Sequence, residues 1–192
     1  MTSQPRPASP LITVEQLAAR LGDPRILVAD CRWVLGQPGA GRVRYDAGHI
    51  PGAVHVDLDT QLADLSITGA GRHPLPSTAA FQAAMAAAGI GDDTLVVAYD
   101  DVGGWVAARL WWMLERLGHP AVQVLDGGIG VWTAAGHELA TEAPNLPPGD
   151  LHLGRAWSGT VDRDEVRARI GTALILDARG GPRYRGETEP ID

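Results

Sequence analysis

Cysteine and long apolar runs are almost absent from this sequence of 192 residues. The single cysteine, Cys31, cannot form a disulfide within the chain. The opening stretch MTSQPRPASPLI has no apolar run long enough for a signal peptide or a membrane span. We therefore expect a cytoplasmic protein that has no membrane partner.

Basic residues are also few, 16 against 23 acidic residues, which gives a formal net charge of −7 at pH 7. This excess of negative charge disfavours binding to nucleic acid or to an anionic membrane surface. Apolar residues make up 45% of the chain and charged residues 20%, so it can bury an ordinary core. The length suits either one large α/β domain or one domain followed by a fragment.

Short apolar runs alternate with helical patterns through the first 140 residues. Strands are predicted at 26–29, 54–57, 95–99 and 122–125, and helices at 13–21, 77–88, 106–117 and 129–135. Residues 1–11 hold three prolines and predict a flexible arm. A long loop is predicted after the strand at 26–29, and its residues 36–41 are turn-rich. This alternation predicts an α/β fold with a mostly parallel sheet covered by helices on both faces.

A repeat marks the domain organisation. The proline-rich stretch 141–158 predicts a linker between a first domain at 12–140 and a second unit at 159–192. In that second unit, a helix from Thr160 and a strand at 173–176 precede Asp177-Ala178-Arg179, which matches Asp30-Cys31-Arg32 after the strand at 26–29. The second unit has room for only about a quarter of the first, so we expect a truncated copy.

Several local strings, in this order, resemble the tandem domains of the rhodanese-like family, the thiosulfate and 3-mercaptopyruvate sulfurtransferases. The strings are Asp30-Cys31-Arg32, Gly48 to Ala53, Tyr99 to Asp101 with Ala108 to Trp112, and Val124 to Gly128 with Trp132. The resemblance implies an enzyme that moves sulfane sulfur from a small anionic donor to a thiol or cyanide acceptor through a Cys persulfide. It implies no cofactor and no metal.

The same resemblance bears on individual residues. Family second domains carry the nucleophilic Cys on the loop after the strand equivalent to 95–99, and Asp100 occupies that position here. Arg183 matches the position of an anion-binding arginine, which implies a substrate-binding role in an intact parent protein. The resemblance therefore implies a non-catalytic first domain, inactive alone, that packs against a second rhodanese domain within the same chain.

The candidate residues also have structural interpretations. Asp100 and Asp101 are expected to cap the helix that begins near Val106. Cys31 is expected to be a small buried residue, because its counterpart in the repeat is Ala178. His49 and His55, with Asp46 and Asp57 nearby, match no metal-binding spacing. Gly103-Gly104 lacks the Lys-Ser/Thr of a nucleotide loop, and the tryptophans favour core or domain-interface packing.

Three hypotheses about function remain open at this point. In the favoured one, the chain is part of a sulfurtransferase whose nucleophilic Cys lies beyond residue 192. In the second, it is a complete, non-catalytic rhodanese-like binding or regulatory module. In the third, which the absence of the usual Asp-x-Asp spacing disfavours, Asp100 and Asp101 bind Mg²⁺ for phosphoryl chemistry. The choice of thiosulfate or 3-mercaptopyruvate, the acceptor and the oligomeric state have no signal in the sequence.

Overall fold

The computed structural model describes residues 5–189. The chain divides into two compact units, residues 1–158 and residues 159–192, and each is described by itself. Among the residues that the structure describes, no helix is both long enough and apolar enough to cross a membrane.

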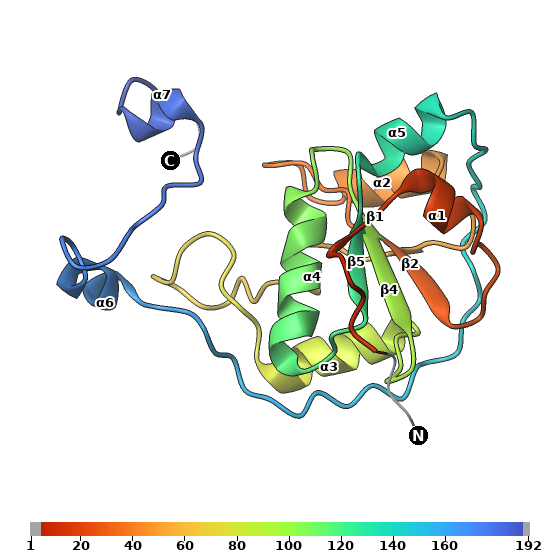
Figure 1. Cartoon of the computed structure of the whole chain (residues 1–192), viewed down its shortest axis with the longest axis horizontal. Coiled ribbons are helices and arrows are strands. Elements are labelled where there is room, and N and C mark those ends of the chain that lie inside the picture. Colours follow the sequence, from red (N-terminus) through yellow and green to blue (C-terminus); the bar gives the residue numbers. More distant parts are fainter. Residues whose placement is uncertain (1–4, 190–192) are drawn as a thin grey trace. The chain divides into compact units, whose positions relative to one another are not determined.

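The first unit is built on a parallel sheet of five strands in the order β1-β5-β4-β2-β3. Figure 1 labels β1, β5, β4 and β2. The strands are β1 Leu11–Ile12, β2 Ile26–Asp30, β3 Val54–His55, β4 Leu95–Tyr99 and β5 Val122–Leu125. β4 is central, pairs with β2 and β5, and is buried along its whole length. Its continuous apolar sequence, LVVAY, is typical of a parallel strand covered on both faces.

Helices cover both faces of this sheet, as the alternation predicts (Figure 1). The helices are α1 Val14–Ala18, α2 Ala40–Ala47, α3 Thr78–Ala87, α4 Trp105–Leu117 and α5 Gly128–Ala134. Val96 and Ala98 of β4 share one apolar cluster with α3 and α4, and Val97 and Tyr99 share the other with α1, α2 and α5. The two-residue period of a strand explains this division. The predicted α/β architecture is therefore confirmed.

Helix α2 falls where the sequence predicts a loop. It begins after Gly39, which has φ +79° and provides no side-chain cap, and only Gly41 and Tyr45 in it are buried. Such a helix has no apolar stripe that a pattern could reveal. Tertiary contacts hold it instead: the Tyr45 hydroxyl donates to the Ala53 carbonyl, and a Cβ at Gly41 would lie 1.9 Å from the Arg32 carbonyl oxygen.

The predicted arm at 1–11 is also partly structured. Its residues 1–4 lie outside the described residues. Farther along, Val124 N–H donates to the Pro10 carbonyl, and the Gln123 side chain donates to the carbonyls of Ser9 and Leu11. β1 thereby completes the edge of β5, and a strand of two residues is too short to show a period in the sequence.

The predicted linker at 141–158 is packed against the first unit in its second half. Leu151 and Leu153 are 3% and 9% exposed and belong to the core cluster of α3 and α4. The prolines at 144, 147 and 148 explain why the stretch has no helix or strand, but an extended chain can still bury side chains. The first unit therefore continues to Ser158.

The second unit consists of two short helices, α6 Arg163–Ala168 and α7 Gly181–Tyr184. α6 begins later than predicted, with Asp162 rather than Thr160 at its N-cap. The strand predicted at 173–176 is absent, and Leu174 and Leu176 are 87% and 79% exposed. A parallel strand needs a neighbouring strand for its hydrogen bonds, and residues 159–189 contain none.

Candidate functional site

The candidate site is the loop at the carboxyl end of β4, where α4 begins. Gly103 and Gly104 have φ of +85° and +90°, a conformation that side chains disfavour. Their left-handed backbone turns the N–H groups of the loop inward, toward the carboxylate of Asp100. The ligands of open parallel sheets usually bind at this end of the strands.

Asp100 fills the centre of this loop with its own carboxylate. Oδ1 accepts hydrogen bonds from the N–H groups of Val102 (3.0 Å) and Gly104 (2.8 Å). Oδ2 accepts from those of Val106 (2.9 Å) and Ala107 (3.0 Å). The residue is 1% exposed, so the negative charge is buried and satisfied by four backbone donors at the positive end of a helix.

Asp101 has a different environment, although both aspartates are predicted to cap α4. Its exposed carboxylate forms an ion pair with Arg44 of α2 and makes no cap. The prediction that Asp101 caps α4 is thus wrong. Asp100 accepts hydrogen bonds from two N–H groups in the first turn of that helix. Because Asp101 faces α2, its pairing with Arg44 joins the loop to the neighbouring helix.

A buried network lies beneath the loop, at the end of β2. The Arg32 guanidinium donates to both carboxylate oxygens of Asp30, at 2.6 to 3.0 Å, and to the Gly48 carbonyl. The Tyr99 hydroxyl donates to Asp30 Oδ2 at 2.6 Å and accepts from Ile50 N–H. Burial, helped by the charge of Asp30, raises the pKa of Tyr99 well above its usual range. For Arg32, burial alone would lower the pKa, but the hydrogen bonds and charge of Asp30 outweigh it and raise the pKa.

Cys31 is inside the core, as its match to Ala178 predicts. The side chain is fully buried, and its Sγ lies 3.8 Å from the Ala29 carbonyl oxygen. Burial, and then the charges of Asp30 and Asp100, raise the pKa of the thiol well above its usual value. A nucleophilic cysteine needs an accessible thiolate, and this environment provides neither access nor charge stabilisation.

The two histidines weighed as metal ligands both pack against the ring of Tyr45. His49 stacks on Tyr45 with the ring centroids 3.9 Å apart, and its ring nitrogens lie 2.8 Å from the Tyr45 carbonyl and 3.2 Å from that of Glu142. His55 packs at a tilt against the same tyrosine. Asp46 pairs with Arg42, and Asp57 accepts from the backbone of the following turn. Within residues 5–189 no group of three or more His, Cys, Asp or Glu could hold a metal ion.

An aromatic cluster beside the loop is not predicted from the sequence. The Trp33 indole packs edge-on against Trp105 (5.9 Å) and His73 (5.2 Å), and it donates to Asp59. Trp105, the first residue of α4, is 54% exposed. Only the position of Trp33 next to Asp30-Cys31-Arg32 hinted at this cluster, because His73 and Asp59 come from a separate loop with no pattern.

Arg109 of α4 holds that separate loop in place. Its guanidinium donates to the carbonyls of Leu62 and His73, at 2.8 to 3.1 Å, and so ties together both ends of the loop. Burial lowers the pKa of Arg109. The sequence string Ala108 to Trp112 marked this arginine as part of a family motif, but only the fold shows what it binds.

These features define a class of protein: a parallel α/β domain with a loop of converging N–H groups between the central strand and its following helix. The family described as "Rhodanese-like domain" matches residues 13–135, and the chain belongs to that family.

Known relatives give the family more detail. The chain is 44% identical over 186 residues to the "Probable 3-mercaptopyruvate sulfurtransferase" of Pseudomonas aeruginosa, covering 95% of this chain and 66% of the relative. It is 39% identical over 137 residues to "Thiosulfate/3-mercaptopyruvate sulfurtransferase 2" of Arabidopsis thaliana, covering 71% of this chain and 39% of the relative. The solved structure of a 3-mercaptopyruvate sulfurtransferase from Leishmania major matches with a TM-score of 0.81 and 32% identity, over 93% of this chain and 50% of that one.

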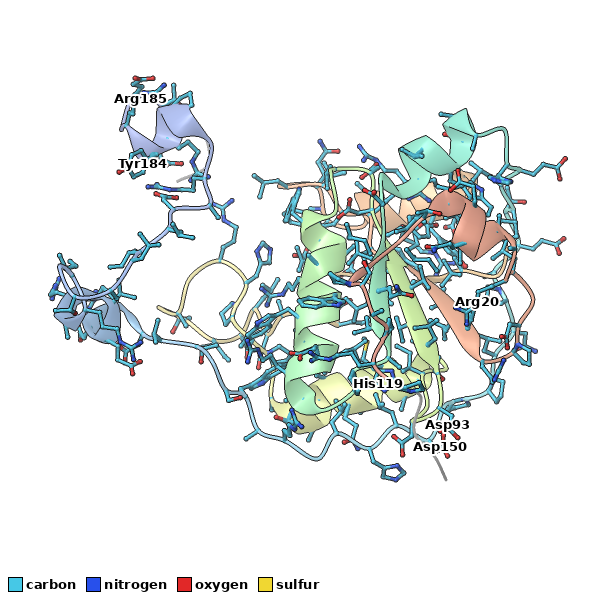
Figure 2. All side chains as sticks on the ribbon, in the orientation of Figure 1. Arg20, Asp93, His119, Asp150, Tyr184 and Arg185 are labelled. Atoms are coloured by element: carbon cyan, nitrogen blue, oxygen red, sulfur yellow. The ribbon has the colours of Figure 1, made fainter. Side chains whose placement is uncertain are left out.

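The chain thus spans less than two thirds of the length of each of these relatives, between 39% and 66%. Arg183, the predicted anion-binding residue, lies in α7 of the second unit, where its guanidinium pairs with Glu189 at 2.5 Å. Figure 2 labels the two residues that follow it, Tyr184 and Arg185, at the end of α7. Arg183 and Glu189 both belong to the second unit, so this ion pair is internal to that unit.

Proposed function

We propose that this chain is the non-catalytic first domain of a tandem sulfurtransferase, together with the start of the second domain. The intact protein would transfer sulfane sulfur from thiosulfate or 3-mercaptopyruvate to a thiol or cyanide. Sulfurtransferase relatives that extend beyond the matched region support this reading, as does the Asp177-Ala178-Arg179 repeat at residues 159–192.

The transfer needs a group that accepts and releases sulfur. A cysteine thiolate attacks the sulfane sulfur of the donor, a new S–S bond forms, and the donor fragment leaves with the electron pair of the broken bond. The acceptor thiolate or cyanide then attacks the outer sulfur and regenerates the thiolate. A carboxylate does neither step, so a domain with Asp100 in the loop requires a cysteine elsewhere.

The observation that carries the proposal is the placement of Asp100. Its carboxylate takes up four N–H groups that would otherwise be available to stabilise a thiolate or an anionic donor. The one thiol of the chain, Cys31, is fully buried and its pKa is raised. In the intact protein we assign the donor anion to Arg183, whose guanidinium can form paired bonds to a carboxylate or thiosulfate.

The test is a turnover assay of the 192-residue chain with thiosulfate and cyanide, and with 3-mercaptopyruvate and a small thiol. We expect no turnover above the uncatalysed rate with either donor. An active tandem relative serves as the positive control, and Cys31→Ala as the matched variant. Turnover of the wild-type chain with either donor would overturn the proposal, and its loss in Cys31→Ala would identify Cys31 as the nucleophile.

A further inference from the structure

A second feature of the first unit is the extended segment 149–157, which we call the clasp. It contains no helix or strand, yet its backbone is held at three points. Gly149 N–H donates to the Ala86 carbonyl (2.8 Å), His152 N–H to Asp92 (2.7 Å) and Leu153 N–H to the Gln82 side chain (2.9 Å). Interactions this specific are typical of a bound peptide.

Three apolar side chains anchor the clasp. Leu151 and Leu153 are two residues apart, so an extended backbone directs both to the same side, into the core cluster of α3 and α4. Trp157 stacks on Trp112 of α4 with centroids 5.9 Å apart and an interplanar angle of 3°, and its indole donates to the Pro76 carbonyl at 2.6 Å. The three side chains form a Leu-x-Leu-x-x-x-Trp pattern that packs against α3 and α4.

The side chain between the two leucines faces the solvent. His152 is 76% exposed and pairs with Asp92, a contact that adds little stability at an exposed site. At the start of the clasp, a Cβ on Gly149 would lie 2.1 Å from the Ile90 carbonyl oxygen, so only glycine fits. Figure 2 labels Asp150, the next residue, together with Asp93 at the end of the sheet where β4 begins.

We propose that the clasp is a tethered peptide ligand of the remainder of the first unit. It is bound by the surface of Pro76, Phe81, Gln82 and Trp112, which lie before α3, on α3 and on α4. The affinity resides in the contacts of Leu151, Leu153 and Trp157 rather than in the covalent connection through residues 141–148. The chain consequently leaves the first unit at a fixed point, Ser158, instead of at the end of a free linker.

The experiment cuts the tether in the full chain. A protease recognition site is inserted after the exposed Ala143, the folded protein is cleaved there, and the two pieces are followed by gel filtration. We expect the piece that contains residues 144–192 to co-elute with the larger piece. An excess of synthetic peptide 148–158 should speed its release.

Two variants of the cleaved piece sharpen the test. Leu153→Asp places a charge in the apolar contact and should speed release by about 30-fold or more. This is the size of effect expected when a residue at the centre of an interface is substituted. Leu174→Asp makes the same change at a residue that is 87% exposed and should leave the rate unchanged. Hydrogen exchange of Leu95–Tyr99 reports whether the larger piece stays folded.

Prompt release of the wild-type piece from a folded larger piece would overturn the proposal, as would equal retention of the wild-type and Leu153→Asp pieces. Unfolding of the larger piece on cleavage would overturn it too, because a ligand is separable from its receptor and an integral part of the core is not.

Discussion

The two copies of the Asp-x-Arg sequence form the same local contact in very different surroundings. In both, the arginine Nε lies 3.0 Å from each carboxylate oxygen and Nη2 lies 2.6 Å from Oδ2. The side chains of Arg32 and Asp30 are 8% and 0% exposed, and those of Arg179 and Asp177 are 44% and 25% exposed. Three residues are enough to shape the contact, but only the sheet and helices of the first unit bury it.

Burial also changes what the contact does. In the first unit the pair sits in a network with Tyr99 and Gly48 under the candidate site. In the second unit the hydrogen bonds of Arg179 lower the pKa of Asp177 to about 2, while the strand that precedes the pair in the first unit is missing. An identical contact is therefore structural in one unit and a solvated surface feature in the other.

The largest effect that we expect separates the two strands of the repeat in hydrogen exchange. Amides of Ile26–Asp30 should exchange only through global unfolding of the unit. The free energy of unfolding of an ordinary domain is about 5 kcal/mol or more. Residues 173–176 should exchange nearly as fast as an unfolded peptide, because they pair with no strand. Mass spectrometry of the intact chain measures both, and slow exchange at 173–176 would break the comparison.

The matched substitutions Asp30→Asn and Asp177→Asn come next. Asp30→Asn leaves the buried Arg32 charge without its counter-charge and should lower the free energy of unfolding by about 3 kcal/mol or more. Asp177→Asn changes an exposed pair and should leave the midpoint of urea unfolding unchanged. Equal effects of the two substitutions would show that burial does not distinguish the copies.

A smaller effect is expected within the first unit, between its neighbouring aspartates. Asp100→Ala removes the acceptor of four backbone N–H groups and should cost about 2–3 kcal/mol in unfolding free energy. Asp101→Ala breaks an exposed ion pair with Arg44 and should cost less than about 1 kcal/mol. Urea titrations followed by tryptophan fluorescence measure both losses. A larger loss for Asp101→Ala than for Asp100→Ala would contradict the assignment of Asp100 as the cap of α4.

The smallest effect concerns the exposed pair His152–Asp92. The hydrogen bond and charge of Asp92 raise the pKa of His152, so this contribution to stability is complete below the usual histidine pKa of about 6.5 and disappears as the pH rises through the folded value. Burial would raise the pKa of Asp92, but its hydrogen bonds with His152 outweigh this and lower it, so the pair weakens only in strong acid. His152→Gln should lower Tm slightly at pH 5.5 and not at pH 8. A larger loss at pH 8 would contradict this assignment.

Much of the first unit could be predicted because its elements carry local signals. The apolar run at Leu95–Tyr99 predicted β4, Thr13 with Gln16 predicted the capping box of α1, and Ser77 predicted the start of α3. α2 and β1 carried no such signal, since their contacts are made with distant parts of the chain. The strand predicted at 173–176 is absent for the opposite reason. Its local signal is present, but residues 159–189 contain no neighbouring strand with which it could pair.

The sequence alone determined the family, the parallel α/β plan and the absence of cysteine from the loop after β4, because each follows from residues that are close together in the chain. Tertiary structure decided which charges are buried. The four N–H groups around Asp100 converge only when β4, the glycine turn and α4 are assembled, and Leu151, Leu153 and Trp157 find their partners only on the packed helices. Contacts between residues far apart in sequence leave no periodic pattern, so the fold itself must bring them together.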